Sequence, residues 1–116
     1  MKYFKISEFD SPDQLGSGKN MKKKFLKMID KARDKAGIPF KINSGFRSEN
    51  HNRLIGGRVG SSHLKGLAAD ISCYNSDQRE KILRACIEVG FNRIGISSSF
   101  IHIDCDDSKN SAIWLY

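Results

Sequence analysis

The chain has 116 residues, of which 39% are hydrophobic and 28% charged, a composition typical of a single globular domain covering residues 1–116. Twenty Lys and Arg against thirteen Asp and Glu give a formal net charge of +7, which suits polyanionic partners such as nucleic acid, an anionic membrane or a bacterial cell wall. Three widely spaced cysteines argue against a disulfide framework and a cysteine-rich zinc site, and we expect them to be buried core residues: Cys73, Cys86 and Cys105. The sequence contains no apolar signal core and no apolar run of membrane-spanning length, so we expect no membrane insertion and synthesis in the cytoplasm without a signal peptide.

The first third of the chain predicts one long helix after an irregular start. Residues 2–9 alternate apolar and polar side chains, which predicts an extended segment. Asn20 is a suitable cap for a helix from Met21 to about Ala36, because apolar residues recur there at helical spacing. Gly37 then ends the helix.

The middle of the chain predicts two short strands separated by a polar, glycine-rich segment. Residues 40–43 are expected to form the first strand, which leads into the loop containing Arg47. Ser48 is expected to cap a helical turn over residues 48–54, which is broken by three glycines: Gly56, Gly57 and Gly60. The small and apolar run Leu67–Ser72 predicts a buried central strand.

The last third predicts a second helix and a hairpin. Asn75 or Ser76 is expected to cap an amphipathic helix over residues 77–89. Residues 93–96 and 100–105 predict two strands joined by a serine turn, and the tail AIWLY supplies an edge strand or packs its tryptophan on the core. These elements together predict an α+β fold, with a small, mainly antiparallel sheet packed against two helices.

Charged and imidazole side chains interrupt two of the predicted apolar strands. Asp70 is the only charged residue in its strand, and a buried carboxylate needs a cation, strong hydrogen bonds or a metal. His102 and Asp104 lie two positions apart, so they point to the same face of a later strand. If His63 joins them, two His and one Asp form the ligand set of an open, catalytic zinc site, with a fourth position for water. The alternative is an ordinary His–Asp hydrogen bond without metal.

The order of the motifs SGFRS, HN, GG, SSHLKGLAADI, GFNRIGI and FIHID resembles the zinc D-alanyl-D-alanine carboxypeptidase family. That family shares its fold with vancomycin-resistance dipeptidases, hedgehog signalling domains and several phage endolysins. The resemblance extends from about Phe9 to Trp114 and implies a hedgehog/D-Ala-D-Ala peptidase-like fold. It also implies zinc as the cofactor, with three ligands: His63, Asp70 and His102. Arg47 matches the arginine that binds substrate and stabilises the developing oxyanion, although a structural salt bridge is the alternative for this side chain.

The general base of the family is missing from its usual position. Many relatives have Glu or Asp three residues before the last zinc-binding histidine, where this chain has Ser99. Asp104 is the nearest replacement as catalytic base, but it could instead orient His102 or Arg47. We expect His51 to be a capping or packing residue and not a metal ligand.

The leading functional hypothesis is a zinc metallopeptidase that cleaves peptide bonds in the stem peptides of bacterial peptidoglycan. The cut could be that of a carboxypeptidase or of an endopeptidase, and the enzyme is expected to be a monomer. Small size, basic charge and the lack of a signal peptide suit a phage-encoded enzyme that acts on the host cell wall. A zinc-bearing binding module without turnover is the second hypothesis. Nucleic-acid binding through the lysines of residues 22–27 is supported by charge alone, so no specific nucleic-acid partner is expected.

Overall fold

The structure is a computed structural model that describes all residues, 1–116. Its centre is a five-stranded sheet. The strand order is β1-β2-β4-β3-β5, and every neighbouring pair is antiparallel except β3 and β5, which run parallel. The strands are β1 (Ile42–Ser44), β2 (Ala68–Ser72), β3 (Arg93–Ile96), β4 (Phe100–Asp104) and β5 (Ala112–Leu115). The predicted α+β class with a mainly antiparallel sheet is confirmed, and the tail forms an edge strand.

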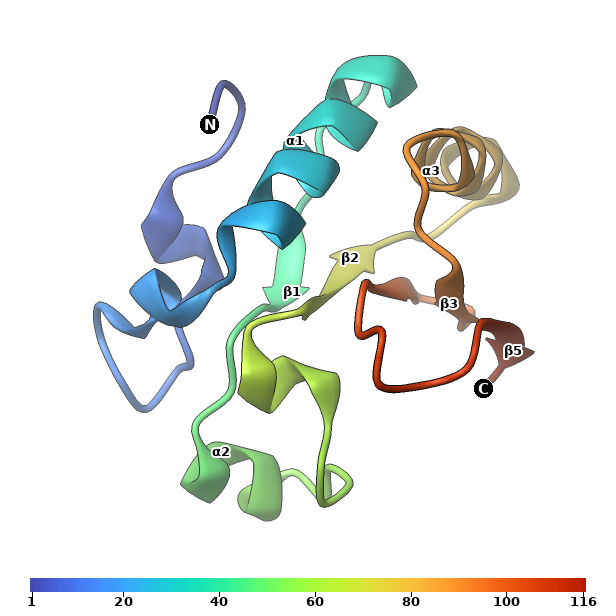
Figure 1. The fold of residues 1–116 in the computed structure, drawn as a ribbon. Coiled ribbons are helices and arrows are strands. Elements are labelled where there is room, and N and C mark those ends of the chain that lie inside the picture. Colours follow the sequence, from blue (N-terminus) through green and yellow to red (C-terminus); the bar gives the residue numbers. More distant parts are fainter.

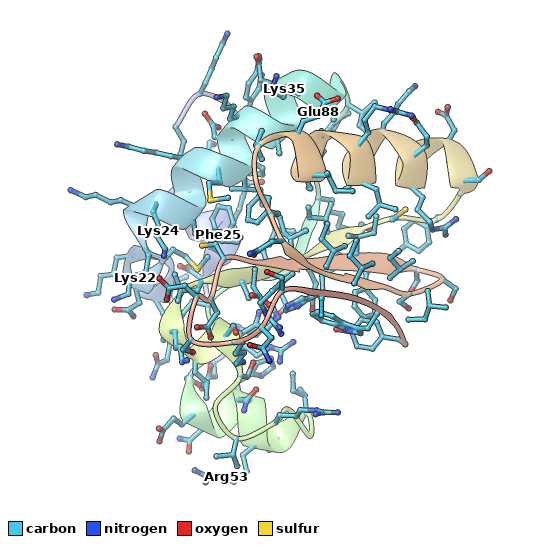
Figure 2. All side chains as sticks on the ribbon, turned by 45° about the vertical axis from the view of Figure 1, so that its right-hand side comes forward. Lys22, Lys24, Phe25, Lys35, Arg53 and Glu88 are labelled. Carbon is cyan, nitrogen blue, oxygen red and sulfur yellow. The ribbon has the colours of Figure 1, made fainter.

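Two helices cover one face of this sheet. Helices α1 (Lys23–Ala36) and α3 (Ser76–Glu88) pack against each other, and Figure 1 shows them on the side of the sheet opposite the short helix α2 (Glu49–Leu54). The apolar stripe of α1 is buried, as its helical spacing predicts: Phe25, Leu26, Ile29 and Ala32. In Figure 2, Phe25 points inward from α1, whereas Lys22 and Lys24 lie on the outside.

Alternation of side chains along the strands separates the core from the opposite face. Ile71 of β2 and Ile101 and Ile103 of β4 are fully buried in the core beneath the helices. Asp70 and His102 are their immediate neighbours in sequence, so they point to the other face. The helices and the candidate site therefore occupy opposite sides of the sheet.

The N-terminal segment is more compact than the sequence suggested. The expected extended segment over residues 2–9 is wrong at its second half, because Ile6–Phe9 form a 3₁₀ helix, η1. The Glu8 carboxylate stabilises this turn by accepting a hydrogen bond from the Lys5 backbone N–H at 2.7 Å. Phe9 is fully buried, so tertiary packing also favours the turn.

The predicted start of the first long helix is also wrong. Asn20 ends a second 3₁₀ helix, η2 (Ser17–Asn20), and α1 begins only at Lys23 without a side-chain cap. Met21 is buried and extended between the two helices. The Lys22 backbone N–H donates to the Gly66 carbonyl at 2.9 Å, a tertiary hydrogen bond that fixes the chain just before the uncapped first turn of α1.

The other predicted helix ends and the hairpin are confirmed. Gly37 ends α1 with a left-handed backbone (φ 69°), and the Ser48 hydroxyl accepts from the backbone N–H of His51 at the start of α2. Asn75 caps α3. Cys105 is only partly buried, unlike the other two cysteines, and all three are free. No helix is both long and apolar enough to cross a membrane.

Candidate metal centre

The register of the sheet places the predicted site residues beside one another. Asp70 of β2 pairs with His102 of β4, which pairs on its other side with Gly95 of β3. His63 comes from the 3₁₀ helix η3 (Ser62–Lys65), immediately before β2. The β2–β4 pairing therefore places Asp70 and His102 side by side, although they are distant in sequence.

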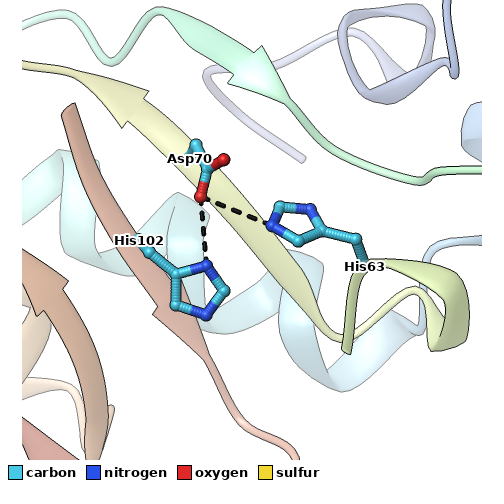
Figure 3. A group of neighbouring side chains, drawn as sticks. All are labelled: His63, Asp70 and His102. Carbon is cyan, nitrogen blue, oxygen red and sulfur yellow. Dashed lines mark hydrogen bonds and ion pairs between the residues drawn. The ribbon is translucent and has the colours of Figure 1, made fainter. Parts of the chain in front are cut away.

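The structure brings the three predicted ligands together (Figure 3). His63 Nε2 lies 3.4 Å and His102 Nδ1 3.0 Å from the same Asp70 oxygen, Oδ1. One ligand atom from each residue lies within 4.8 Å of the other two. Both histidines are buried, with 2% and 8% of their surface exposed, so the cluster is set into the protein rather than on its surface.

Hydrogen bonds at the far nitrogens fix how each imidazole faces this cluster. His63 Nδ1 lies 2.8 Å from the Gly45 carbonyl oxygen, which can only accept, so Nδ1 carries the proton and Nε2 presents a lone pair to Asp70. His102 Nε2 lies 2.7 Å from Asp104 Oδ2 and donates to it, which leaves the Nδ1 lone pair facing Asp70. Three electron-pair donors thus face one point, an arrangement that is unfavourable unless a cation or a proton sits among them. Two imidazoles and a carboxylate are the donors that an open zinc site uses, so the residues present fit zinc.

The protonation of the cluster agrees with this need for positive charge. Burial opposes ionisation of Asp70, but in the metal-free protein a proton held between Asp70 and the facing imidazole nitrogens, chiefly that of His102, outweighs burial and holds the pKa of Asp70 far below its usual value. Burial lowers the pKa of His63, which keeps that ring neutral. Burial also opposes protonation of His102, but the hydrogen bonds that its ring donates to the Asp104 and Asp70 carboxylates prevail and raise the pKa of His102. The carboxylates of Asp70 and Asp104 thus favour positive charge at His102, a preference that a bound cation would also satisfy.

Arg47 borders the cluster on the side of the second Asp70 oxygen. Its Nη2 lies 3.4 Å from Asp70 Oδ2, while Nε donates to Ser44 Oγ at 3.0 Å and Nη1 to Asn52 Oδ1 at 3.3 Å. Burial lowers the pKa of Arg47, but a guanidinium remains charged at neutral pH. The side chain forms a salt bridge, which was the alternative role for it, and it also places a fixed positive charge beside the predicted ligands.

Asp104 lies behind His102, not in front of it. Its side chain is 1% exposed, and Oδ1 accepts from Arg93 Nε at 2.8 Å and from the Asp106 backbone N–H at 3.1 Å. Oδ2 accepts from His102, so both oxygens are engaged on the side of the ring away from Asp70. Burial opposes ionisation, but the bonds from His102 and Asp106 lower the pKa of Asp104 and keep it charged. This geometry suits a residue that orients His102.

The remaining candidates lie outside the cluster. Ser99 is exposed in the turn between β3 and β4 and does not line the cleft. His51 donates its backbone N–H to the cap of α2 and is absent from the group of ligand atoms, as expected.

An open cleft of about 1000 Å³ surrounds the cluster. One wall is the glycine-rich segment 55–62, and the opposite wall is formed by the C-terminal aromatic residues. Trp114 leans across Gly95 so that its ring centroid lies 5.4 Å from that of His102. A Cβ at Gly95 would lie 2.6 Å from Trp114 Nε1, so the missing side chain makes room for the indole.

Sequence reasoning missed two residues that support the site. Arg93 holds Asp104, as described above. Asp106 is 2% exposed and accepts hydrogen bonds from Ser62 Oγ at 2.7 Å and Lys65 Nζ at 3.0 Å, which fastens η3 and therefore His63 to the segment after β4. The partners of Asp106 are 44 and 41 residues away in sequence, so no local sequence pattern predicts these two hydrogen bonds.

The fold and the donor set are those of a zinc-peptidase-like protein, and comparison with known families identifies which kind. The model of the family Peptidase M15 matches residues 2–104, which is most of the chain. The protein therefore belongs to the M15 family, the zinc D-alanyl-D-alanine carboxypeptidase family that its motifs resemble. No curated protein matches the chain. The match ends at Asp104, so β5 and its aromatic residues lie beyond it.

Proposed function

We propose that this protein is a zinc-dependent peptidase that hydrolyses peptide bonds in the stem peptides of bacterial peptidoglycan. The observation that carries the proposal is the convergence of two imidazole lone pairs and one carboxylate in an open cleft, beside a fixed arginine. Membership of a peptidase family supports hydrolysis as the reaction.

His63, Asp70 and His102 would hold the zinc ion. Bound there, zinc would lower the pKa of a water molecule to about 7 and polarise a peptide carbonyl. Gly45 and Asp104 hold the two imidazole rings in the tautomers that leave a lone pair for the metal. The chain thus supplies a preformed donor set and does not depend on substrate to assemble it.

Arg47 acts on the substrate in this proposal. Its guanidinium is held by Ser44 and Asn52, so it is oriented before a substrate arrives. A guanidinium in this position can donate to a carbonyl oxygen as negative charge develops on it, or fork onto a terminal carboxylate. Three more cationic residues line the cleft, Arg58, Arg93 and Lys109. Arg93 is paired with Asp104, so Arg58 and Lys109 are the ones that suit the carboxylates of stem peptides.

Asp104 has an orienting role in this proposal and is not the base. A general base must reach the water from which it takes the proton, and Asp104 is fully buried with both oxygens occupied. Asp104 accepts a hydrogen bond from His102 Nε2, which fixes the ring with Nδ1 toward Asp70.

The same proposal extends to the place of action. The cleft is open, so it suits either removal of a terminal D-alanine or a cut at a cross-link. The net charge of +7 suits an anionic wall, and we place the enzyme among monomeric phage-encoded proteins that are made in the cytoplasm and degrade the host cell wall.

Mass spectrometry of purified peptidoglycan after digestion tests this function. The zinc-loaded protein should release peptide products or D-alanine, and a chelator should abolish release until zinc is restored. His63→Ala and His102→Ala should each lose zinc and activity, whereas His51→Ala removes a histidine outside the cluster and should keep both. Full zinc content in both cluster variants, or hydrolysis that survives chelation, would refute the assignment.

A second function, a zinc-bearing binding module without turnover, is favoured by one observation. The only carboxylates that line the cleft are Asp70, which faces the histidines, and the buried Asp104. The cleft therefore offers no free carboxylate as a general base. Zinc-dependent binding of peptidoglycan fragments without any product in the digestion would establish this second function.

A further inference from the structure

A shallow hollow of about 830 Å³ lies between the N-terminal segment and the outer side of α1, away from the metal centre. Its apolar floor includes Tyr3, Ile6, Met21 and Leu26. Five lysines surround this floor, and we refer to the feature as the lysine groove: Lys2, Lys19, Lys23, Lys27 and Lys31. The lysine groove thus combines exposed cations with apolar surface, and a ligand for it must match both.

The lysines of the groove carry charge that the protein does not neutralise. All five are exposed, and none forms an ion pair, in contrast to Lys24, Lys65, Lys81 and Lys109. Lys23, Lys27 and Lys31 are spaced by four residues on α1, so their like charges lie in one row. That row costs stability in the isolated protein, and an anion bound along it would relieve the repulsion.

Two aspartates at the groove are occupied by the chain itself. The Asp30 carboxylate accepts from the backbone N–H groups of Lys2 and Tyr3, both at 2.9 Å, and the Asp34 carboxylate accepts from the Tyr3 hydroxyl. These bonds hold the N-terminal segment against α1. They leave five lysines facing two engaged carboxylates, so the groove keeps an excess of positive charge.

The apolar floor indicates what kind of anion the groove fits. Ile6 is 45% exposed within the ring of lysines, although an isoleucine gains free energy when it leaves water. A polyanion such as nucleic acid would use the lysines but not the floor, and the groove has no row of aromatic rings for stacking bases. Anionic phospholipids match both features, because the headgroup phosphates can contact the lysines while apolar side chains enter the interface.

The position of the groove is compatible with a bilayer at this surface. The metal centre lies on the face of the sheet that is turned away from α1. A membrane in contact with the groove would therefore leave the cleft unobstructed.

We propose that the lysine groove binds the anionic phospholipid surface of a bilayer as a peripheral site, without insertion of any helix. The site is independent of the peptidase function, because the residues of the groove and of the metal cleft do not overlap. Electrostatic attraction supplies most of the binding, so the affinity should fall as salt is raised.

Sedimentation with lipid vesicles tests the proposal on the full chain. The protein should bind vesicles of phosphatidylcholine mixed with phosphatidylglycerol, but not vesicles of phosphatidylcholine alone. Lys23→Ala/Lys27→Ala should weaken that binding by roughly 25-fold, because each surface lysine near an anionic bilayer contributes about fivefold. Alanine is a strong helix former, so this variant should fold. Lys41→Ala/Lys81→Ala removes the same charge from exposed positions outside the groove and should bind nearly as wild type.

A third variant separates lipid from nucleic acid. Ile6→Ser should weaken vesicle binding but leave the affinity for double-stranded DNA unchanged, because only a bilayer can accept the isoleucine. The proposal is overturned if wild type ignores the anionic vesicles at low salt, or if both lysine pairs lose binding equally. Binding to DNA that depends on Lys23 and Lys27, without vesicle binding, would overturn it in favour of nucleic acid. Hydrolysis of a soluble peptide substrate should be equal in all variants, so failure here is distinct from failure of the peptidase assignment.

Discussion

Asp104→Asn should weaken zinc binding by changing which nitrogen of His102 carries the proton. In the native protein Asp104 Oδ2 accepts from His102 Nε2, which leaves Nδ1 free to bind a metal. The asparagine oxygen can keep the bonds from Arg93 and from the Asp106 N–H, so its NH₂ group must face His102. An NH₂ group donates, so Nε2 would have to accept and the proton would move to Nδ1, where it blocks the metal site.

The expected magnitude follows from the loss of this one orienting contact. Removing a group that orients a metal-binding histidine weakens affinity by roughly 10–100-fold, or about 1.4–2.7 kcal/mol. The metal-free protein should also lose about 1–3 kcal/mol of stability, because Arg93 loses a charged partner that is 1% exposed. Zinc affinity can be measured by competition with a chromophoric chelator, with circular dichroism to confirm that the variant is folded.

Arg93→Gln is the matched control for this experiment. It removes the same ion pair but leaves Asp104 facing His102, so it should lower stability more than zinc affinity. Zinc affinity in Asp104→Asn equal to that of wild type would refute the tautomer argument. If the variant keeps its zinc and still loses hydrolysis when zinc is in excess, Asp104 takes part in proton transfer and the orienting role is wrong.

Substitutions at three further positions test other parts of the structure. Arg47→Ala should lower hydrolysis by roughly 10²–10³ at unchanged zinc content, and Arg47→Lys should recover little, because an ammonium cannot replace the planar fork. Asp106→Asn should lower stability at neutral pH by about 1–3 kcal/mol, measured by urea unfolding. Burial opposes ionisation of Asp106, but hydrogen bonds from Ser108, Ser62 and Lys65 hold its pKa below the usual value, so its contribution is present above about pH 4 and disappears as the pH falls further. Gly95→Ala should cost about 1–3 kcal/mol and alter the fluorescence of Trp114, the only tryptophan, because the added Cβ would lie 2.6 Å from its Nε1.

Each of these variants has an outcome that contradicts its reasoning. If Arg47→Ala does not fold, the role of the arginine is that of a structural salt bridge and not of a group that acts on the substrate. A fall in stability below pH 4 that is as steep in Asp106→Asn as in wild type would show that Asp106 does not contribute to it. The added Cβ at Gly95 would also lie 2.7 Å from Tyr116 Cε2, so truncating both rings, in Trp114→Ala/Tyr116→Ala, should remove most of the added cost of Gly95→Ala. A cost of Gly95→Ala that is unchanged in this background would exclude the clash as its cause.

The sequence by itself determined the residue types of the site and much of the local structure. Helix ends follow from short-range chemistry, so Gly37, Ser48 and Asn75 could be recognised as stops and caps. Alternation along β4 predicted that His102 and Asp104 share a face, because side chains on a strand repeat every two residues. The family motifs supplied the proposed ligand set, and the match over residues 2–104 confirms the family.

Only the tertiary structure decided how these residues face one another. The β2–β4 register sets Asp70 beside His102, and the contacts at the far nitrogen place Asp104 behind the ring, which spacing along one strand cannot reveal. The same holds for the start of α1, which has no side-chain cap and follows a hydrogen bond from Lys22 to the distant Gly66. The Asp70–His102 pairing and the Lys22–Gly66 bond join residues tens of positions apart, so their free energy depends on the packed fold and leaves no periodic signal in the chain.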